Sequence, residues 1–167
     1  MHHVAGGAAG ACRVAQRRLG SVDKMARVVQ RFEVSLKAFL LDGDKALFLK
    51  ERDTGLWELP GGRIDVGEEA HAHSEILARE LAEELGVGMR VHFGDATVSW
   101  TRAHPEGGPW VFLIARVGRL VAGTPVLSDE HDGFVWASPE TWRDLRFPPQ
   151  SGYVDGVSAL WRIARQP

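Results

Sequence analysis

Hydrophobic and polar residues begin to alternate near position 31, and this alternation predicts a β-strand over 31–41. The Asp-Gly-Asp sequence at 42–44 supplies turn chemistry, and the chain is apolar again at 46–49, so we expect a β-hairpin. A short apolar piece at 56–59 follows and is stopped by the Pro-Gly-Gly sequence at 60–62. Up to this point the pattern therefore predicts strands and turns.

The spacing of apolar residues changes to a helical period after position 70. Leu77, Leu81 and Leu85 fall on one stripe, and Gly86 stands where a helix commonly ends. We therefore expect a helix over about 70–85.

The remaining pattern returns to strands and closes with helices. Strands are expected at 91–103, 110–117 and 134–136, a helix start at 138–140 and a closing helix at 154–164. The resulting order, β-β-β-α-β-β-β-α-α, implies a mixed sheet covered by helices, which is an α/β or α+β sandwich.

Length and composition fit one globular domain. The chain has 167 residues, of which 44% are hydrophobic and 25% charged, so it can bury an ordinary core. We assign a single domain to residues 25–167. Residues 1–24, which are rich in Ala and Gly, are expected to be a flexible tail, with Met25 as an alternative start.

Charge is unevenly distributed along the chain. Residues 1–30 hold five Lys or Arg against one acid, whereas the remaining 137 residues hold 15 bases and 21 acids. The excess of acidic residues in this part of the chain disfavours nucleic acid as a partner, because the phosphate backbone binds basic surfaces. It suits a protein that recruits divalent cations and a small-molecule substrate.

The single cysteine, Cys12, excludes an intramolecular disulfide, so we expect a cytoplasmic protein. No apolar run approaches the roughly 18–20 residues needed to cross a bilayer, so no membrane partner is expected. A homodimer through the strand-rich surface that precedes residue 60 is left open.

Three carboxylates gather on the expected helix. Glu80, Glu83 and Glu84 stand at i, i+3 and i+4, on one arc of the helix next to the leucine stripe. A hard cation offsets their repulsion, and Mg²⁺ or Mn²⁺ suits carboxylates and phosphates better than zinc does. The alternative interpretation is that they solvate an exposed helix face beside Arg79, as charge runs usually do.

Two glycines precede this helix. Because Gly61 and Gly62 have no Cβ, their backbone can approach a bound ion or a phosphate closely. A carbonyl group there is a candidate to complete the coordination of a metal.

The stretch from Gly62 to Val87 resembles the Nudix box, whose pattern is G, five residues, E, seven residues and R-E-U-x-E-E-x-G-U, with U a bulky aliphatic residue. Gly62 and Glu68 match its front, and the sequence RELAEELGV at 79–87 matches its back at every position. The lead-in LWELPGG at 56–62 also resembles the usual approach to the box. The resemblance implies a Nudix-type α/β/α sandwich around a mixed β-sheet. It also implies hydrolysis of a phosphoanhydride bond in a nucleoside diphosphate linked to another group.

One departure from the family pattern is an insertion. Ten residues separate Glu68 from Arg79 where the family has seven, and the three extra residues, close to one helical turn, either lengthen the helix or bulge the loop before it. We expect the bulge, with Ser74 capping a helix that begins at Glu75. Which of these occurs decides whether Glu68 and Arg79 form the ion pair that braces loop against helix in the family.

The resemblance implies that Glu83 and Glu84 bind the essential Mg²⁺, or Mn²⁺ in its place, with Glu80 and the carbonyl of Gly61 or Gly62 as further ligands. A water activated by metal, with a carboxylate as base, would then attack phosphorus in line with the leaving phosphate.

One glutamate and two histidines outside the helix carboxylates are further candidates for metal ligands, and the glutamate is also a candidate base. Many relatives place a glutamate shortly before a strand that carries Trp, and Glu130 fits that description as a base or an extra ligand. An acidic turn in water is the alternative for Glu130. His71 and His73 are better explained as solvated loop residues than as metal ligands, because no third partner accompanies them.

The sequence says less about the substrate. Trp100, Trp110 and Phe112 lie on strands expected to flank the site and are candidates to stack on a base, although aromatic residues in this number are more often core. Relatives specialised for ADP-ribose carry a proline beyond the box, and those for dinucleoside polyphosphates a tyrosine. The corresponding region, 102–105, supports neither specialisation. The substrate class therefore stays open among nucleoside triphosphates, nucleotide sugars, ADP-ribose and similar molecules.

Two other functions fit part of the sequence. Isoprenoid diphosphate isomerase resembles Nudix proteins in fold but needs a cysteine in its sheet, whereas Cys12 lies in the tail. A non-catalytic regulatory domain that binds a nucleotide sugar is disfavoured by the complete set of box carboxylates, because a pure binder has no evident use for so much like charge.

Overall fold

The computed structural model describes residues 28–104 and 107–166. The chain divides into two units, Met1–Gln30 and Arg31–Pro167, and every helix and strand named below belongs to the second unit. The expected tail at 1–24, with Cys12, and the alternative start at Met25 lie outside the described residues.

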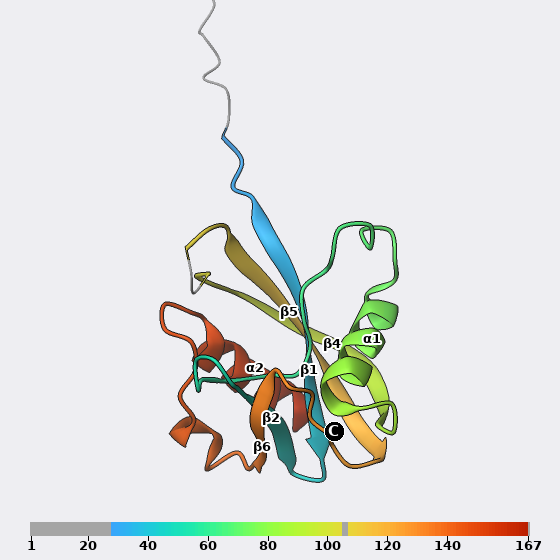
Figure 1. The fold of residues 1–167 in the computed structure, drawn as a ribbon. Coiled ribbons are helices and arrows are strands. Elements are labelled where there is room, and N and C mark those ends of the chain that lie inside the picture. Colours follow the sequence, from blue (N-terminus) through green and yellow to red (C-terminus); the bar gives the residue numbers. More distant parts are fainter. Residues whose placement is uncertain (1–27, 105–106, 167) are drawn as a thin grey trace, which may run out of the picture. The chain divides into compact units, whose positions relative to one another are not determined.

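The strands and helices of the second unit follow one another in the order expected from the sequence (Figure 1). The elements are β1 (Phe32–Asp42), β2 (Lys45–Glu51), β3 (Trp57–Glu58), α1 (His73–Leu85), β4 (Arg90–Arg102), β5 (Trp110–Ala122), β6 (His131–Ala137), the 3-10 helix η1 (Trp142–Asp144) and α2 (Tyr153–Ala164). Among the described residues, no helix has both the length and the apolar character that crossing a membrane requires.

The strands form one mixed sheet. β1 and β5 pair in parallel, and the other neighbouring strands pair antiparallel. The order is β3-β2-β1-β5-β4, with β6 also paired to β2. β1 and β2 pair only beside their hairpin turn, at Leu41 with Ala46 and Asp42 with Lys45. Beyond this point β3 lies beside β2, whereas residues 60–64 lie beside β1, so the sheet opens between the two strands.

The period-two alternation of β1 divides the core between the two faces of the sheet. Leu36, Ala38 and Leu40 pack in the cluster that contains the leucine stripe of α1. Phe39 and Leu41 pack in the other cluster, which contains the buried face of α2. Each helix therefore covers its own face of the sheet, and the expected α/β/α sandwich around a mixed sheet is confirmed.

Several elements differ from the sequence-based expectation, and one of them is β6, which begins at His131 rather than at 134. α1 begins at His73 rather than near 70, and β5 continues to Ala122 rather than ending near 117. The expected helix after Ser138 is reduced to η1, because the hydroxyl groups of Ser138 and Thr141 accept backbone N–H groups locally. Prolines at 148 and 149 then leave no room for a longer helix.

Candidate active site

The Pro-Gly-Gly turn at 60–62 fills the opening between β1 and β2. Its backbone extends the hydrogen bonding of β1, because the N–H of Ala38 donates to the carbonyl of Pro60 at 2.8 Å and the N–H of Leu36 donates to the carbonyl of Gly62 at 2.9 Å. The sheet itself therefore fixes the position of this glycine turn.

Close approach requires glycine at both positions of the turn. Gly61 has a φ of +116°, and a Cβ there would lie 2.2 Å from the carbonyl oxygen of Leu36. A Cβ at Gly62 would lie 2.1 Å from Oε2 of Glu80. At Gly61 the blocking atom belongs to the backbone, so a side chain is excluded, whereas a side chain at Gly62 would displace the carboxylate of Glu80. The two glycines thus allow the carboxylates of α1 to lie directly against the backbone.

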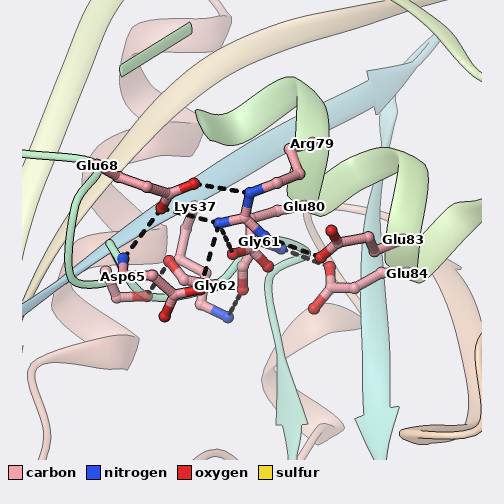
Figure 2. Close-up of polar contacts among 10 residues, drawn as sticks. Lys37, Gly61, Gly62, Asp65, Glu68, Arg79, Glu80, Glu83 and Glu84 are labelled. Carbon is pink, nitrogen blue, oxygen red and sulfur yellow. Dashed lines mark hydrogen bonds and ion pairs between the residues drawn. The ribbon is translucent and has the colours of Figure 1, made fainter. Parts of the chain in front are cut away.

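The box carboxylates reach the turn from α1 (Figure 2). Oε2 of Glu84 accepts the N–H of Gly61 at 2.6 Å, and the side chain of Glu84 is only 7% exposed. Glu80 lies against Gly62 and is 12% exposed. Glu83 is 58% exposed and points to Arg79. The structure therefore brings Glu80 and Glu84 together at the glycines and leaves Glu83 closer to solvent.

Burial changes the ionisation of the two inner carboxylates. Desolvation raises the pKa of Glu84 to about 7, although Lys37 and the N–H of Gly61 act in the opposite direction. Desolvation also raises the pKa of Glu80, against the lowering effect of Arg79. A positive charge brought beside them would lower both pKa values. The pair is therefore a place where a bound cation is electrostatically favoured.

A buried lysine lies next to the same turn. Lys37, on β1, has a side chain only 4% exposed, donates a hydrogen bond to the carbonyl of Gly61 and pairs with Oε2 of Glu58 at 3.1 Å. A buried ammonium group requires such partners. Its charge also offsets part of the negative charge at Glu84.

The two glycine carbonyls are not equally available to a metal. The carbonyl of Gly62 accepts both the N–H of Leu36 and the hydroxyl of Ser35, the latter at 3.1 Å. These two bonds occupy both of its lone pairs. The carbonyl of Gly61 accepts one described donor, Lys37, and so is the better candidate of the two named from the sequence.

Arg79 joins the loop to the helix. Its Nε and Nη2 donate to the two carboxylate oxygens of Glu68 at 2.9 and 3.0 Å. Nη1 lies 2.9 Å from Glu83, and Nη2 lies 2.9 Å from Glu80. The ion pair between Glu68 and Arg79 is therefore formed despite the insertion, and Arg79 also orients two of the box carboxylates (Figure 2).

The loop absorbs the three-residue insertion, as expected. It closes through a hydrogen bond of 2.9 Å from the N–H of His71 to the carbonyl of Glu68, and α1 starts only at His73. The expected cap is wrong, because Ala72 is the N-cap and its N–H is accepted by Glu75 at 3.4 Å, whereas Ser74 lies inside the first turn. His71 and His73 are exposed, and among the described residues neither belongs to a cluster of metal-ligand side chains.

The loop before β6 carries two further groups to Glu84. Hydrogen bonds from the N–H groups of Val126 and Ser128 to the carbonyls of Leu85 and Glu84 attach this loop to the end of α1. Glu130, which is exposed, and His131, which is buried, follow directly. Ligand atoms of Glu84, Glu130 and His131 lie within 4.8 Å of one another. The structure therefore brings the expected residue Glu130 into the site.

These groups line a cleft of about 790 Å³. Among the described residues, its lining is largely charged and includes Lys37, Glu58, Glu80, Glu84, Glu130, His131, Arg52, Arg63 and Arg102. A side pocket of about 310 Å³ adds apolar surface from Leu56, Trp57 and Pro148. It shares four described lining residues with the cleft: Glu51, Glu58, Arg102 and His104.

The donor set fits the hard divalent cation that the family resemblance implies. Glu80, Glu84 and Glu130 supply carboxylate oxygens to one cleft. Two of these carboxylates have raised pKa values that a cation would lower. Oxygen donors of this kind beside a space for phosphate are the environment that Mg²⁺ and Mn²⁺ prefer.

The three aromatic residues named as candidates for base stacking lie elsewhere. Trp100 is 8% exposed and packs in the core against Tyr153, because Gly152 and Gly156 of the α2 region leave space for its indole ring. Trp110 is 44% exposed at the start of β5, and Phe112 packs edge-on to Phe32. None of the three belongs to the described lining of the cleft or of the side pocket.

Sequence reasoning missed Lys37, Glu58, Trp57 and His131. A signal existed for Lys37, since a single charge interrupts the apolar run of β1, and a charge in a buried strand requires a partner. His131 directly follows Glu130, so the same loop argument could have included it.

Replacing Glu68 by Gln should lower the melting temperature at pH 7, and should lower it less at pH 3. The N–H of Asp65 and the side chain of Arg79 bind the charged form of Glu68 and lower its pKa below the ordinary 4.5. A carboxyl group with a lowered pKa contributes stability above its unfolded pKa, and this contribution is lost as the pH falls through the folded pKa. Thermal unfolding followed by circular dichroism at both pH values measures the effect.

The matched control is Glu69→Gln, because the carboxylate of Glu69 accepts the N–H of Gly67 and its pKa is also lowered. It should change the melting temperature at pH 7 less than Glu68→Gln does. Equal changes would assign the effect to the loop backbone and not to the ion pair.

Comparisons with known proteins agree with this geometry. The NUDIX domain family matches residues 31–154, more than half of the chain, so the chain belongs to the Nudix family. A Bacillus subtilis (strain 168) protein provisionally named 8-oxo-dGTP diphosphatase is 45% identical over 47 residues, which are 28% of this chain and 30% of that protein. A Mycobacterium tuberculosis (strain CDC 1551 / Oshkosh) protein, provisionally named 8-oxo-dGTP diphosphatase 2, is 46% identical over 66 residues, 32% of this chain and 45% of that protein.

Among solved structures, the MutT protein from Methanosarcina mazei Go1 superposes with a TM-score of 0.64 and 25% identity. The match covers 84% of this chain and all, 100%, of that protein. The fold agreement is therefore extensive, whereas this chain spans less than half the length of the two sequence relatives.

Proposed function

We propose that this chain hydrolyses a phosphoanhydride bond of a nucleoside diphosphate that carries a further group, and that its preferred substrates are nucleoside triphosphates. Two sequence relatives with 45% and 46% identity over the matched residues are provisionally named for the diphosphatase reaction on 8-oxo-dGTP. Triphosphates with an oxidised purine are therefore the first substrates to test.

One observation carries the proposal: the desolvated pair Glu80 and Glu84 lies against the glycine turn, in a cleft that also holds arginines. Burial raises the pKa values of both carboxyl groups, so keeping them ionised side by side costs free energy that a purely structural role does not require. Perturbed carboxylates in a cleft are typical of a catalytic site.

A divalent cation held by Glu84 and Glu80, with Glu83 and the carbonyl of Gly61 as further candidate ligands, would withdraw charge from the phosphate oxygens when bound. The chain's own residues supply the other requirements. Arg52 and Arg102 line the cleft and offer guanidinium groups to phosphate oxygens. Arg79 forms an ion pair with Glu80 and another with Glu83, and so holds both carboxylates in place.

Hydrolysis also requires a base for the attacking water. We assign this role to Glu130, whose carboxylate lines the cleft and whose carbonyl is anchored by the N–H of Arg52 at 3.0 Å. The water oxygen forms a bond to phosphorus, the anhydride P–O bond breaks, and Glu130 takes the proton from the water. A nucleoside triphosphate would yield a nucleoside monophosphate and inorganic diphosphate.

The side pocket is the proposed location of the nucleoside. Its volume of about 310 Å³ falls at the lower end of the range for small-molecule sites. Leu56, Trp57 and Pro148 provide apolar faces on which a planar base can pack. Arg102 lines both the side pocket and the cleft, so a base in the pocket would direct its phosphates toward the carboxylates.

A substrate panel with Mg²⁺ tests the proposal. We expect 8-oxo-dGTP and ordinary nucleoside triphosphates to be hydrolysed with kcat/KM at least about tenfold above that for nucleotide sugars, ADP-ribose and dinucleoside polyphosphates, a difference of about 1.4 kcal/mol in transition-state binding. Chromatography of the products should show the nucleoside monophosphate and inorganic diphosphate.

Other outcomes of the panel discriminate the alternatives. Hydrolysis confined to nucleotide sugars or ADP-ribose would contradict the triphosphate assignment and retain the hydrolase. No hydrolysis of any member, together with tight binding of one nucleotide in calorimetry, would replace the enzyme by the regulatory domain.

A further inference from the structure

A buried ion pair bridges the place where the sheet opens between β1 and β2. Lys37 belongs to β1, whereas Glu58 belongs to β3, which pairs with β2. Nζ of Lys37 lies 3.1 Å from Oε2 of Glu58, and the two side chains are only 4% and 16% exposed. Replacement of such a pair by apolar residues is often neutral or stabilising, so the burial of these charges points to a role other than stability.

Gly61 is held by charged side chains at both of its peptide groups (Figure 2). Its N–H, in the peptide that follows Pro60, is accepted by Oε2 of Glu84 at 2.6 Å. Its carbonyl, in the peptide that precedes Gly62, accepts a hydrogen bond from Nζ of Lys37. A glycine changes its backbone conformation at little cost, so such bonds limit how its peptide groups can turn. Lys37 therefore orients the carbonyl that is the candidate metal ligand.

The ammonium group of Lys37 is also close enough to the box carboxylates to act on them. Desolvation raises the pKa values of Glu80 and Glu84, and the charge of Lys37 acts on both in the opposite direction. Among the described residues, however, Glu58 is the only carboxylate that forms an ion pair with Lys37. Glu58 therefore balances the ammonium charge, and the charge of Glu84 stays available to a divalent cation.

We propose that Lys37 and Glu58 are positioning residues for the cation at the glycine turn. Lys37 holds the carbonyl of Gly61 in one orientation, and Glu58 prevents the same ammonium group from competing with the cation for Glu84. Without Glu58, the buried ammonium group would take the box carboxylates as its counter-charge, and a divalent cation would have to displace it. The inference rests on the proposed function, because it concerns the same cation.

Calorimetric titration of the full chain with Mn²⁺, without nucleotide, tests the competition through a double-mutant cycle. Glu58→Gln should weaken Mn²⁺ binding by about tenfold or more, because the unpaired ammonium group then competes for Glu84. In a Lys37→Met background, the same change should weaken Mn²⁺ binding by less than about threefold, because no ammonium group is left to compete. A pair with a purely structural role would not produce this dependence.

The orientation of the Gly61 carbonyl has a separate readout. The N–H of Gly62 belongs to the same peptide group as this carbonyl, so ¹⁵N relaxation of Gly62 reports how firmly the peptide is held. The order parameter of Gly62 should fall in Lys37→Met. It should keep its wild-type value in Lys45→Met, which removes an exposed lysine at the start of β2. An unchanged order parameter in Lys37→Met would overturn the positioning role of Lys37.

Glu51→Gln is the control for the loss of a negative charge. Glu51 lines the same cleft as Glu58, but among the described residues it forms no ion pair with Lys37. Its replacement should change the Mn²⁺ affinity by less than about threefold. Equal weakening by Glu51→Gln and Glu58→Gln, or an equal loss from Glu58→Gln in both backgrounds, would overturn the proposal.

If Lys37→Met does not fold, the comparison of Glu58→Gln with Glu51→Gln decides. Unchanged Mn²⁺ binding in Glu58→Gln would contradict competition by Lys37, whereas weakening confined to Glu58→Gln would support it. Because the titrations contain no nucleotide, these results are independent of whether the chain hydrolyses nucleoside triphosphates.

Discussion

Replacing Glu84 by Gln should reduce kcat/KM for nucleotide hydrolysis by at least about 100-fold, which corresponds to about 2.7 kcal/mol of transition-state stabilisation. Glu84 contacts the glycine turn and faces His131, so loss of its charge weakens the cation binding proposed for the cleft. The fold should survive, because the side chain is buried with a pKa raised to about 7 and a neutral amide of the same shape suits that environment. Steady-state kinetics with Mg²⁺ and thermal unfolding by circular dichroism measure the two effects.

Two further variants complete this experiment. Glu75→Gln changes an exposed carboxylate in the first turn of the same helix and should leave the kinetics unchanged. Glu83→Gln should also reduce turnover, because the family resemblance assigns Glu83 to the metal ligands. Near-normal rates in both Glu83→Gln and Glu84→Gln would remove the carboxylates from the mechanism.

Replacing Gly61 by Ala should destabilise the protein by about 2–4 kcal/mol and abolish most of its activity. The residue has a φ of +116°, and the new Cβ would lie 2.2 Å from the carbonyl oxygen of Leu36, which is backbone and cannot rotate away. Relief of this clash requires the glycine turn to leave β1, and Glu84 would then lose the N–H that it accepts. Urea unfolding gives the free energy change.

Gly67 offers a matched control for the conformational part of this effect. Its φ is +99°, and nothing lies within 4 Å of the position of a Cβ. Gly67→Ala should therefore cost only the strain of the left-handed conformation, about 1–2 kcal/mol, and leave turnover nearly intact. Equal losses in the two variants would show that conformation alone, and not the contact with β1, determines the role of Gly61. If Gly61→Ala fails to fold whereas Gly67→Ala folds, the expected result is obtained in its extreme form.

The sequence predicted the fold and the box because both depend on local periodicity. Leu77, Leu81 and Leu85 fixed one face of α1, and the same helical spacing placed Glu80, Glu83 and Glu84 on the adjoining arc. The ion pair of Glu68 with Arg79 forms because the loop, and not the helix, absorbs the insertion. Chemistry that lies within one helix and its preceding turn can thus be inferred from spacing.

The rest of the site depends on pairings between distant segments. Lys37 belongs to the site because β1 and β2 separate and residues 60–64 lie beside β1. No local sequence pattern predicts this pairing. His131 reaches Glu84 through the pairing of β6 with β2 and through the attachment of its loop to α1. Trp100 was a candidate to stack on a base because its strand was expected to flank the site, but in the folded chain its ring packs against Tyr153 and the glycines of α2.

The contact of Trp100 with Gly152 and Gly156 links the core to the rim of the side pocket. The indole ring of Trp100, on β4, packs directly against the backbone of α2, since a Cβ at Gly156 would lie 2.5 Å from that ring. The segment 148–150, which leads into α2 and borders the side pocket, is thereby anchored from within the protein interior. The position of this border of the side pocket therefore depends on how a buried tryptophan packs, and a smaller residue at Trp100 would move the border as well as open a cavity in the core.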